Sequence, residues 1–141
     1  MNIISLIVPG HPISKERPRT VSRGGFHTYT PTRSTDFADM VRVMARDRMW
    51  KQDFKKIFKP NTVELDILFV LKGKTQPSAR PDVNNLAANV LDGLQGAWIE
   101  DDCQVVKLHA MKMKGVVEGT LIRLTAVKES ECQLSLSTAS A

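Results

Sequence analysis

Three aspartates have the clearest potential for chemistry in this sequence, and two of them are adjacent. Asp101 and Asp102 follow Glu100 directly, and Asp82 lies upstream of them. Neighbouring carboxylates repel each other, and a hard cation bound between them offsets that repulsion. Mg²⁺ takes oxygen ligands of this kind and can activate a phosphodiester towards hydrolysis. The pattern favours a metal-dependent nuclease in which Asp82, Asp101 and Asp102 are catalytic.

Both acidic groups also have simpler interpretations. Asp82 follows Pro81 at the expected start of a helix, where an aspartate side chain can accept hydrogen bonds from the first backbone N–H groups. Residues 100–102 can be an acidic turn in water. A metal site requires the two groups to converge, which a strand edge facing a helix N-terminus can achieve.

Lysines and arginines are concentrated in the first part of the chain. Residues 1–60 contain 12 basic and 5 acidic residues, a net charge of +7, whereas residues 61–141 contain 8 basic and 10 acidic residues, a net charge of −2. This asymmetry is typical of a surface that binds a polyanion, although a solvated surface without a partner gives the same counts. The candidate DNA-binding residues are Lys15, Arg17, Arg19, Arg23, Lys72, Lys74 and Arg80.

Hydrophobic periodicity predicts the elements that must position these groups. Strands are expected at residues 2–8, 63–71, 104–113 and 120–127, and helices at about 32–52 and 83–95. Loops are expected at residues 14–32 and 72–81, and a short extended piece at 97–99. The order β-α-β-α-β-β predicts a single α+β domain, with a mixed sheet of about four strands and two main helices.

Each predicted helix has one apolar face that can pack on the sheet. Asp82 is expected at the N-cap of the helix at 83–95, and Gly93 and Gly96 are expected to help end it. Its apolar positions are Val83, Leu86, Ala87, Val90, Leu91 and Leu94. In the helix at 32–52, Arg42, Arg46 and Arg48 are expected on the face opposite the apolar one.

Length and composition fit one soluble domain with one core. We expect residues 1–128 to form it and the Ser- and Thr-rich residues 129–141 to be a disordered tail. Cys103 and Cys132 lack metal-ligand spacing and are expected to be reduced. No apolar run approaches the roughly 18–20 residues that span a bilayer. We therefore expect a cytoplasmic protein with no membrane partner and no small-molecule cofactor.

The segment from residue 81 to 105 resembles the RusA family of Holliday-junction resolvases of bacteria and their phages. That family's pattern is approximately Pro-Asp-x-Asp-Asn-Leu-x-Lys, then Asp-x-Leu in a helix, then Asp-Asp-x-Gln-Val. The matching residues are Pro81, Asp82, Asn85, Leu86, Asp92, Leu94, Asp101, Asp102, Gln104 and Val105. Gly10, Pro12, residues 15–19 and residues 29–31 also match, so the resemblance covers residues 3–127.

This resemblance implies a homodimer that resolves Holliday junctions or other branched DNA by paired symmetric nicks, in DNA recombination and repair. A two-fold dimer would present two matching active sites to a four-way junction. The resemblance implies Mg²⁺, or alternatively Mn²⁺, held by Asp82 and Asp102, with Asp101 as a ligand or close support. It also implies a bacterial or phage-encoded protein.

Two positions depart from the family pattern. Asn84 stands where the family has Asp, and Ala88 where it has Lys, so a carboxylate and an ammonium are absent together from one helix face. Asn84 can still offer a neutral carbonyl oxygen to a metal. A cation from another direction can replace the lysine, and the candidates are Lys72, Lys74 and Lys107.

These departures leave a second function open. The protein can be a junction-binding or DNA-binding relative whose catalysis is weak or lost. A third interpretation is a partner-binding module whose acidic turn is merely solvated.

Overall fold

Strand β4 (Thr62–Leu71) runs through the interior of a four-stranded sheet in the computed structural model. The sheet order is β1-β6-β4-β5, where β1 is Ile3–Pro9, β5 is Val105–Lys114 and β6 is Gly119–Val127. Strand β4 pairs in parallel with β5 and antiparallel with β6, and β6 is antiparallel to β1. The sheet is therefore mixed, as predicted.

The structure describes residues 2–21, 24–25, 27–29, 32–73 and 78–127. The tail predicted at residues 129–141 lies outside these ranges. So do the candidate DNA-binding residues Arg23 and Lys74, and the side chain of Arg19.

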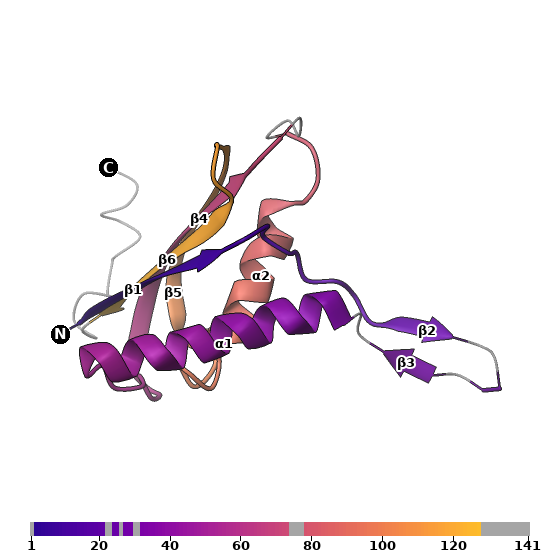
Figure 1. Cartoon of the computed structure of the whole chain (residues 1–141). Helices are drawn as coiled ribbons and strands as arrows, with labels where there is room; N and C mark the ends of the chain where they lie inside the picture. The colour runs from indigo at the N-terminus through magenta and orange to yellow at the C-terminus, as the bar shows by residue number, and fades with distance from the viewer. Residues whose placement is uncertain (1, 22–23, 26, 30–31, 74–77, 128–141) are drawn as a thin grey trace, which may run out of the picture.

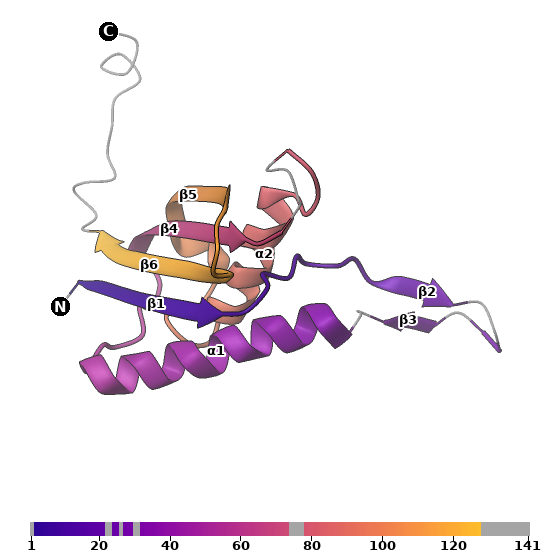
Figure 2. The ribbon, with the colours of Figure 1, turned by 45° about the horizontal axis from the view of Figure 1, so that its top comes forward.

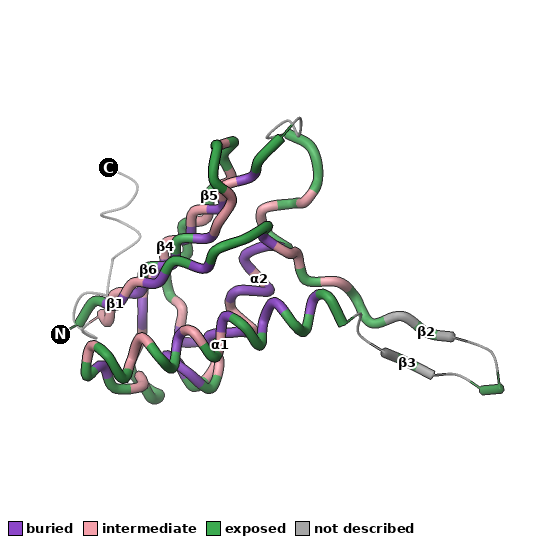
Figure 3. The backbone as a smooth tube through the Cα atoms, in the orientation of Figure 1, coloured by how far each residue is buried: buried purple, intermediate pink, exposed green. Residues whose placement is uncertain are grey.

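One face of the sheet is covered by two helices, α1 (Thr32–Gln52) and α2 (Val83–Leu94), as Figures 1 and 2 show. Every second residue of β4 from Val63 to Leu71 is buried, because only one face of the strand meets the helices. The buried stretches of α1, α2 and the sheet lie towards one another in Figure 3. The α+β fold with two main helices is confirmed.

Helices α1 and α2 approach each other closely at Gly93. A Cβ atom built there would lie 2.7 Å from both the carbonyl oxygen of Ala38 and the Cβ of Val41. Gly93 is therefore a contact residue inside α2, and the expectation that it helps to end the helix was wrong. Gly96, just beyond the helix, has a φ of +84° that favours glycine and fits the predicted stop.

Arg42 holds the C-terminal end of α2. Its Nε donates to the carbonyl oxygen of Gln95 at 3.1 Å, and its Nη2 donates to that of Asp92 at 2.6 Å. The sequence analysis put Arg42 on the outer face of α1, and the structure corrects this. The last carbonyl groups of a helix lack partners within it, and a cation beside them is favoured by the helix dipole.

The segment predicted as a loop at residues 14–32 contains a two-stranded ribbon. Strands β2 (Arg19–Val21) and β3 (His27–Tyr29) pair antiparallel with each other. Figures 1 and 2 show the ribbon extending away from the sheet and helices. Strands of three residues give too short a period to be recognised in a sequence rich in Arg, Gly and Pro.

A buried connection joins α2 to β5 and holds the acidic residues 100–102 between them. Ala97, Trp98 and Ile99 are buried, and the Trp98 indole N–H donates to the carbonyl oxygen of Ala45 on α1 at 2.9 Å. A short 3₁₀ turn, Asp102–Gln104, then leads into β5. None of the described helices is long and apolar enough to cross a membrane.

Gly93→Ala should destabilise the protein by about 1–3 kcal/mol, because the added methyl group overpacks the α1–α2 contact. Intrinsic helix propensity alone would make Gly93→Ala more stable than the parent, so a loss of stability can be attributed to packing. Chemical denaturation measures it. Val43→Ala, on the exposed face of α1, is the control and should stay within about 0.5 kcal/mol. A Gly93→Ala variant as stable as the parent would contradict the close contact.

Candidate active site

Asp82 stands at the start of α2 with an exposed side chain. It is the N-cap residue by backbone conformation, and its carbonyl oxygen accepts a hydrogen bond from the Leu86 N–H at 3.1 Å. Its side chain makes no capping hydrogen bond, so the interpretation of Asp82 as a side-chain cap was wrong. A carboxylate oxygen instead lies 3.6 Å from a guanidinium nitrogen of Arg80. The Asp82 carboxylate is therefore available for another ligand.

A cavity of about 280 Å³ adjoins Asp82. It lies where the segment after β1 meets the starts of α1 and α2. Its polar lining residues include His11, Glu16, Arg33, Arg80, Asp82 and Asn85. Glu16 and Arg33 were not among the predicted site residues. Only the position of Glu16, between the predicted Lys15 and Arg17, could have drawn attention to it.

Lys112, on β5, holds the backbone segment that precedes Asp82. Its ammonium donates to the carbonyl oxygen of Ala79 at 2.7 Å and to that of Pro81 at 2.9 Å. The start of α2 is thereby tied to the end of β5. The sequence analysis did not single out Lys112, because nothing in an alternating strand indicates which lysine turns back to a loop.

Asp101 is paired with a lysine that the sequence analysis also missed. The Lys59 ammonium lies 3.0 Å from a carboxylate oxygen of Asp101. This hydrogen bond is the main reason that the pKa of Asp101 is lowered to about 2, and the Cys103 thiol, which donates to Asp101 at 3.3 Å, adds to the effect. Asp101 therefore stays ionised far below neutral pH.

Asp102 is shifted in the opposite direction. Its partial burial is the first cause of a raised pKa, and a hydrogen bond to Asp101 is the second, because only the protonated carboxyl of Asp102 can donate to its neighbour. The negative charges of Asp101 and Asp92 raise the pKa further, whereas the charge of Lys15 lowers it. A divalent cation would relieve the same repulsion.

Gln104 holds the acidic turn in shape. Its side-chain oxygen accepts hydrogen bonds from the backbone N–H groups of Glu100 at 2.7 Å and Asp101 at 3.0 Å. Its side-chain nitrogen donates to the carbonyl oxygens of Ile57 at 3.1 Å and Asn61 at 2.9 Å. The side chain is buried and fully used, so the glutamine after the aspartate pair is a structural residue.

Asp82 and the Asp101–Asp102 pair lie at opposite ends of α2. The helix has 12 residues, and a rise of about 1.5 Å per residue separates its ends by about 18 Å. Lys112, near the end of β5, hydrogen-bonds to the carbonyl oxygen of Pro81, so Asp82 lies at that end of the strand. Asp102 directly precedes the start of β5. Among the described residues, no group of three or more His, Cys, Asp or Glu side chains could hold a metal ion. One chain thus presents the predicted ligands as two separate groups.

The remaining predicted residues that the structure describes are exposed or accessible. Arg17, Lys72 and Arg80 are exposed, and Lys107 lies on the exposed edge strand β5. Asn84 is exposed in the first turn of α2, and Ala88 is half-buried one turn later. Of these residues, Arg80 adjoins Asp82, whereas Lys107 lies near the start of β5, which Asp102 directly precedes.

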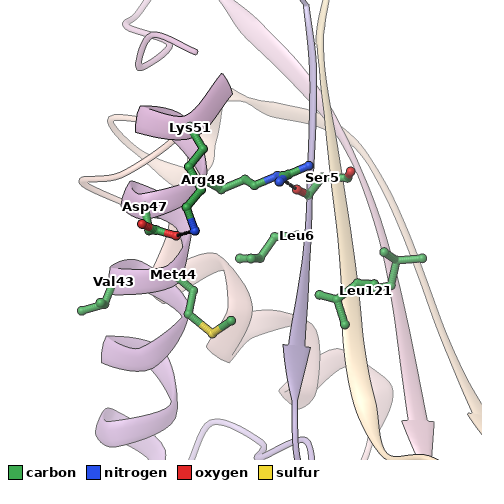
Figure 4. Close-up of a pocket in the computed structure, with 9 residues that line it drawn as sticks. Ser5, Leu6, Val43, Met44, Asp47, Arg48, Lys51 and Leu121 are labelled. Carbon is green, nitrogen blue, oxygen red and sulfur yellow. Dashed lines mark hydrogen bonds and ion pairs between the residues drawn. The ribbon is translucent and has the colours of Figure 1, made fainter. Parts of the chain in front are cut away.

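A groove larger than the cavity beside Asp82 lies elsewhere, between α1 and β1. Its volume is about 650 Å³, and Figure 4 shows its lining side chains. The Arg48 Nε donates to the carbonyl oxygen of Ser5 at 3.1 Å, and Lys51 pairs with Asp47 at 2.8 Å. No predicted site residue lines this groove. The candidate site is therefore identified by its carboxylates and not by the volume of its cavity.

A family model decides the relationship of this chain. The model of endodeoxyribonuclease RusA matches residues 9–125. The chain belongs to the RusA family. It is also similar to the uncharacterised protein YqaN of Bacillus subtilis (strain 168), with 27% identity over 125 residues, which cover 79% of this chain and 88% of that protein. The matched region extends from the end of β1 to β6, so it includes Asp82 and the Asp101–Asp102 pair.

Lys59→Ala should raise the pKa of Asp101 from about 2 towards its ordinary value, because the largest stabilising contact of the carboxylate is removed. NMR titration of the side-chain carboxyl carbon measures the change. Lys55→Ala, a nearby exposed lysine, is the control and should leave the titration unaltered.

The same pair predicts a pH dependence of stability. Folding lowers the pKa of Asp101, so the stabilisation is present above the unfolded-state pKa and is lost as the pH falls towards 2. An unchanged Asp101 titration in Lys59→Ala would contradict the pairing.

Proposed function

We propose that this protein is a metal-dependent, structure-specific endodeoxyribonuclease that nicks four-way junctions or other branched DNA. The match of the RusA endodeoxyribonuclease model to residues 9–125 carries this proposal. The accessible carboxylate of Asp82 and the electrostatically strained pair Asp101–Asp102 support it. In this proposal, paired symmetric nicks serve DNA recombination and repair.

The proposed metal is Mg²⁺, or Mn²⁺, because its ligands are carboxylate oxygens. A bound divalent cation supplies Lewis-acid polarisation of the phosphate and a more acidic water. The ligands proposed are Asp82, Asp102 and Asp101, with Asn84 as a neutral donor. The described residues of one chain do not fit such a site alone, because Asp82 lies at the other end of α2 from the pair.

We infer that a second copy of the chain completes the site. Strand β5 is at the edge of the sheet, with β4 as its one neighbour in the described sheet. It has ten residues, and its exposed apolar side chains include Val106, Leu108 and Met111. A long exposed edge strand of this kind is a template for pairing with another chain.

Antiparallel pairing of β5 with its copy, about a two-fold axis, has a direct consequence for the acidic residues. The end of β5 near Lys112 in one protomer would lie beside the start of β5 in the other. Asp82 is tied to the first end, and Asp101–Asp102 immediately precede the second. The two separated groups of one chain would then form two composite sites in the dimer.

The proposed DNA-binding residues are Lys15, Arg17, Arg19, Arg23, Lys72, Lys74 and Arg80. Those that the structure describes with side chains are exposed or half-exposed. Binding of such residues to phosphates releases counterions from the DNA, and the free energy gained by this release falls as the salt concentration rises, so junction binding should fall steeply with ionic strength.

Asp82→Asn and Asp102→Asn should each reduce cleavage of a synthetic four-way junction by at least about a hundredfold, because each removes a proposed metal ligand. Junction binding should remain. Cleavage is followed with Mg²⁺ and with Mn²⁺, and Asp47→Asn on the far part of α1 is the matched control.

Wild-type protein that binds junctions but never cuts them with either metal would replace this proposal with that of a DNA-binding relative. Asn84→Asp combined with Ala88→Lys would then test whether those two positions caused the loss. A protein that binds no DNA at low salt would exclude both nucleic-acid functions.

Mixing the inactive variants Asp82→Asn and Asp102→Asn should restore nicking. In a mixed dimer with composite sites, one site has lost both residues and the other retains both. With half of the dimers mixed, about a quarter of the wild-type sites are intact. Cleavage by re-equilibrated mixtures measures the recovery. If two singly inactive variants stay inactive when mixed, the site lies within one chain.

A further inference from the structure

Residues 50–60 combine lysines with exposed aromatic side chains. This basic aromatic segment contains four lysines and one aspartate, a net charge of +3, and three aromatic residues. It extends from the last turn of α1 towards β4 (Figure 1). Phe54 is buried in the core, whereas Trp50 is 88% exposed and Phe58 is 56% exposed. None of these residues was among the predicted DNA-binding residues, so the segment is a surface without an assigned role.

The two tryptophans of the chain have opposite environments. Trp98 is fully buried, and its indole N–H donates to the carbonyl oxygen of Ala45, so it serves the core. Trp50, in the last turn of α1, leaves most of its ring in water. Aromatic rings remove a large apolar area from water when a flat partner covers them. The Trp50 ring is therefore available for a ligand.

The backbone on both sides of Phe58 is bound to the segment that leads to the aspartate pair. The Ile57 N–H donates to the carbonyl oxygen of Trp98 at 2.8 Å. The Lys59 N–H donates to a carboxylate oxygen of Glu100 at 3.0 Å. Phe58 thus presents an exposed ring at a fixed place beside the acidic turn.

A lysine of the same segment lies over the Phe58 ring. The Lys56 ammonium is 5.2 Å from the ring centroid, which is within the range of a cation–π contact. Lys55, the residue before it, is exposed. An aromatic ring beside ammonium groups matches the two parts of a nucleotide, because a base can stack on the ring while its phosphate is attracted to the cations.

The composition of this surface favours a nucleic acid over a protein partner. Lysine is depleted at protein–protein interfaces, whereas a positive surface with aromatic rings is the combination that binds single-stranded nucleic acid. Bases inside a linear duplex are stacked on each other and offer no free face. A base can stack on a protein ring only where that duplex stack is interrupted, as at a branch point.

We propose that Trp50 and Phe58 stack on unpaired nucleobases at the branch point of DNA, within the positive field of the lysines of the basic aromatic segment. This inference rests on the proposed function for its substrate, branched DNA. It adds a means by which the protein distinguishes a branch from a linear duplex. Because Lys59 pairs with Asp101, bases bound at Phe58 would lie close to the acidic pair.

Trp50 provides a fluorescent probe for this contact. Trp98 is fully buried, so a change of tryptophan fluorescence on binding reports on Trp50. A synthetic four-way junction, added without metal, should quench the fluorescence of the wild type, whereas a linear duplex of the same length should quench it much less. Trp50→Phe keeps an aromatic ring but removes the probe, so it should lose the quenching and retain the affinity.

Binding affinities test the energetic contribution of the two rings. Trp50→Ala and Phe58→Ala should each weaken junction binding by about tenfold, because a stacking contact is lost. Neither should change the affinity for the linear duplex, nor the slope of log affinity against log salt, because no phosphate contact is removed. Ile7→Ala is the matched control, since it removes a 67% exposed apolar side chain from the open face of the sheet. Thermal unfolding checks that every variant is folded.

The outcomes separate this inference from the proposed nuclease function. Unchanged junction affinity in both alanine variants, or an unquenched wild type at saturating junction, would overturn the inference and leave the nuclease proposal standing. A loss of self-association in place of DNA affinity, measured by sedimentation, would assign the surface to a contact between copies and also overturn it. Wild-type protein that binds with the expected quenching and never cuts would support the inference and remove the nuclease function. A protein that binds no DNA would overturn both.

Discussion

The close packing of α2 against α1 at Gly93 positions the helix that separates Asp82 from Asp92 and Asp102. Because no side chain separates the helices there, Arg42 can reach the last carbonyl groups of α2. Trp98, which follows the helix, hydrogen-bonds to the backbone of α1. These contacts fix the position of α2, with Asp82 at one end and Asp92 and Asp102 at the other. Its length then prevents these carboxylates from meeting within one chain.

The environment of the acidic turn separates two adjacent aspartates into different roles. Asp101 is paired with Lys59, which lowers its pKa, whereas partial burial and the carboxylates of Asp101 and Asp92 raise the pKa of Asp102. Gln104 keeps both in place by bonding the backbone of the turn rather than their carboxylates. The turn therefore stores an electrostatic repulsion that a cation can relieve. That repulsion is the physical argument behind the proposal that the pair binds a metal ion.

Much of the fold followed from the sequence because periodicity reports burial. The alternation in β4 and the apolar stripe of α2 specified their faces, and the starts and ends of the main elements were close to those observed. Partners of polar groups were harder to predict. Arg42 is polar and looked external, but helix ends need donors and acceptors from any direction. The Lys15–Asp92 and Lys59–Asp101 pairs join segments far apart in sequence, so only the tertiary structure reveals them.

The ribbon of β2 and β3 leads to a consequence for how this protein can diversify. Its strands pair with each other and extend away from the core, so they contribute little to the packing that holds α2. Residues there can be exchanged, or the turn lengthened, without disturbing the geometry of the carboxylates. The ribbon can therefore vary in sequence independently of the core, while the rest of the molecule accumulates substitutions under separate constraints.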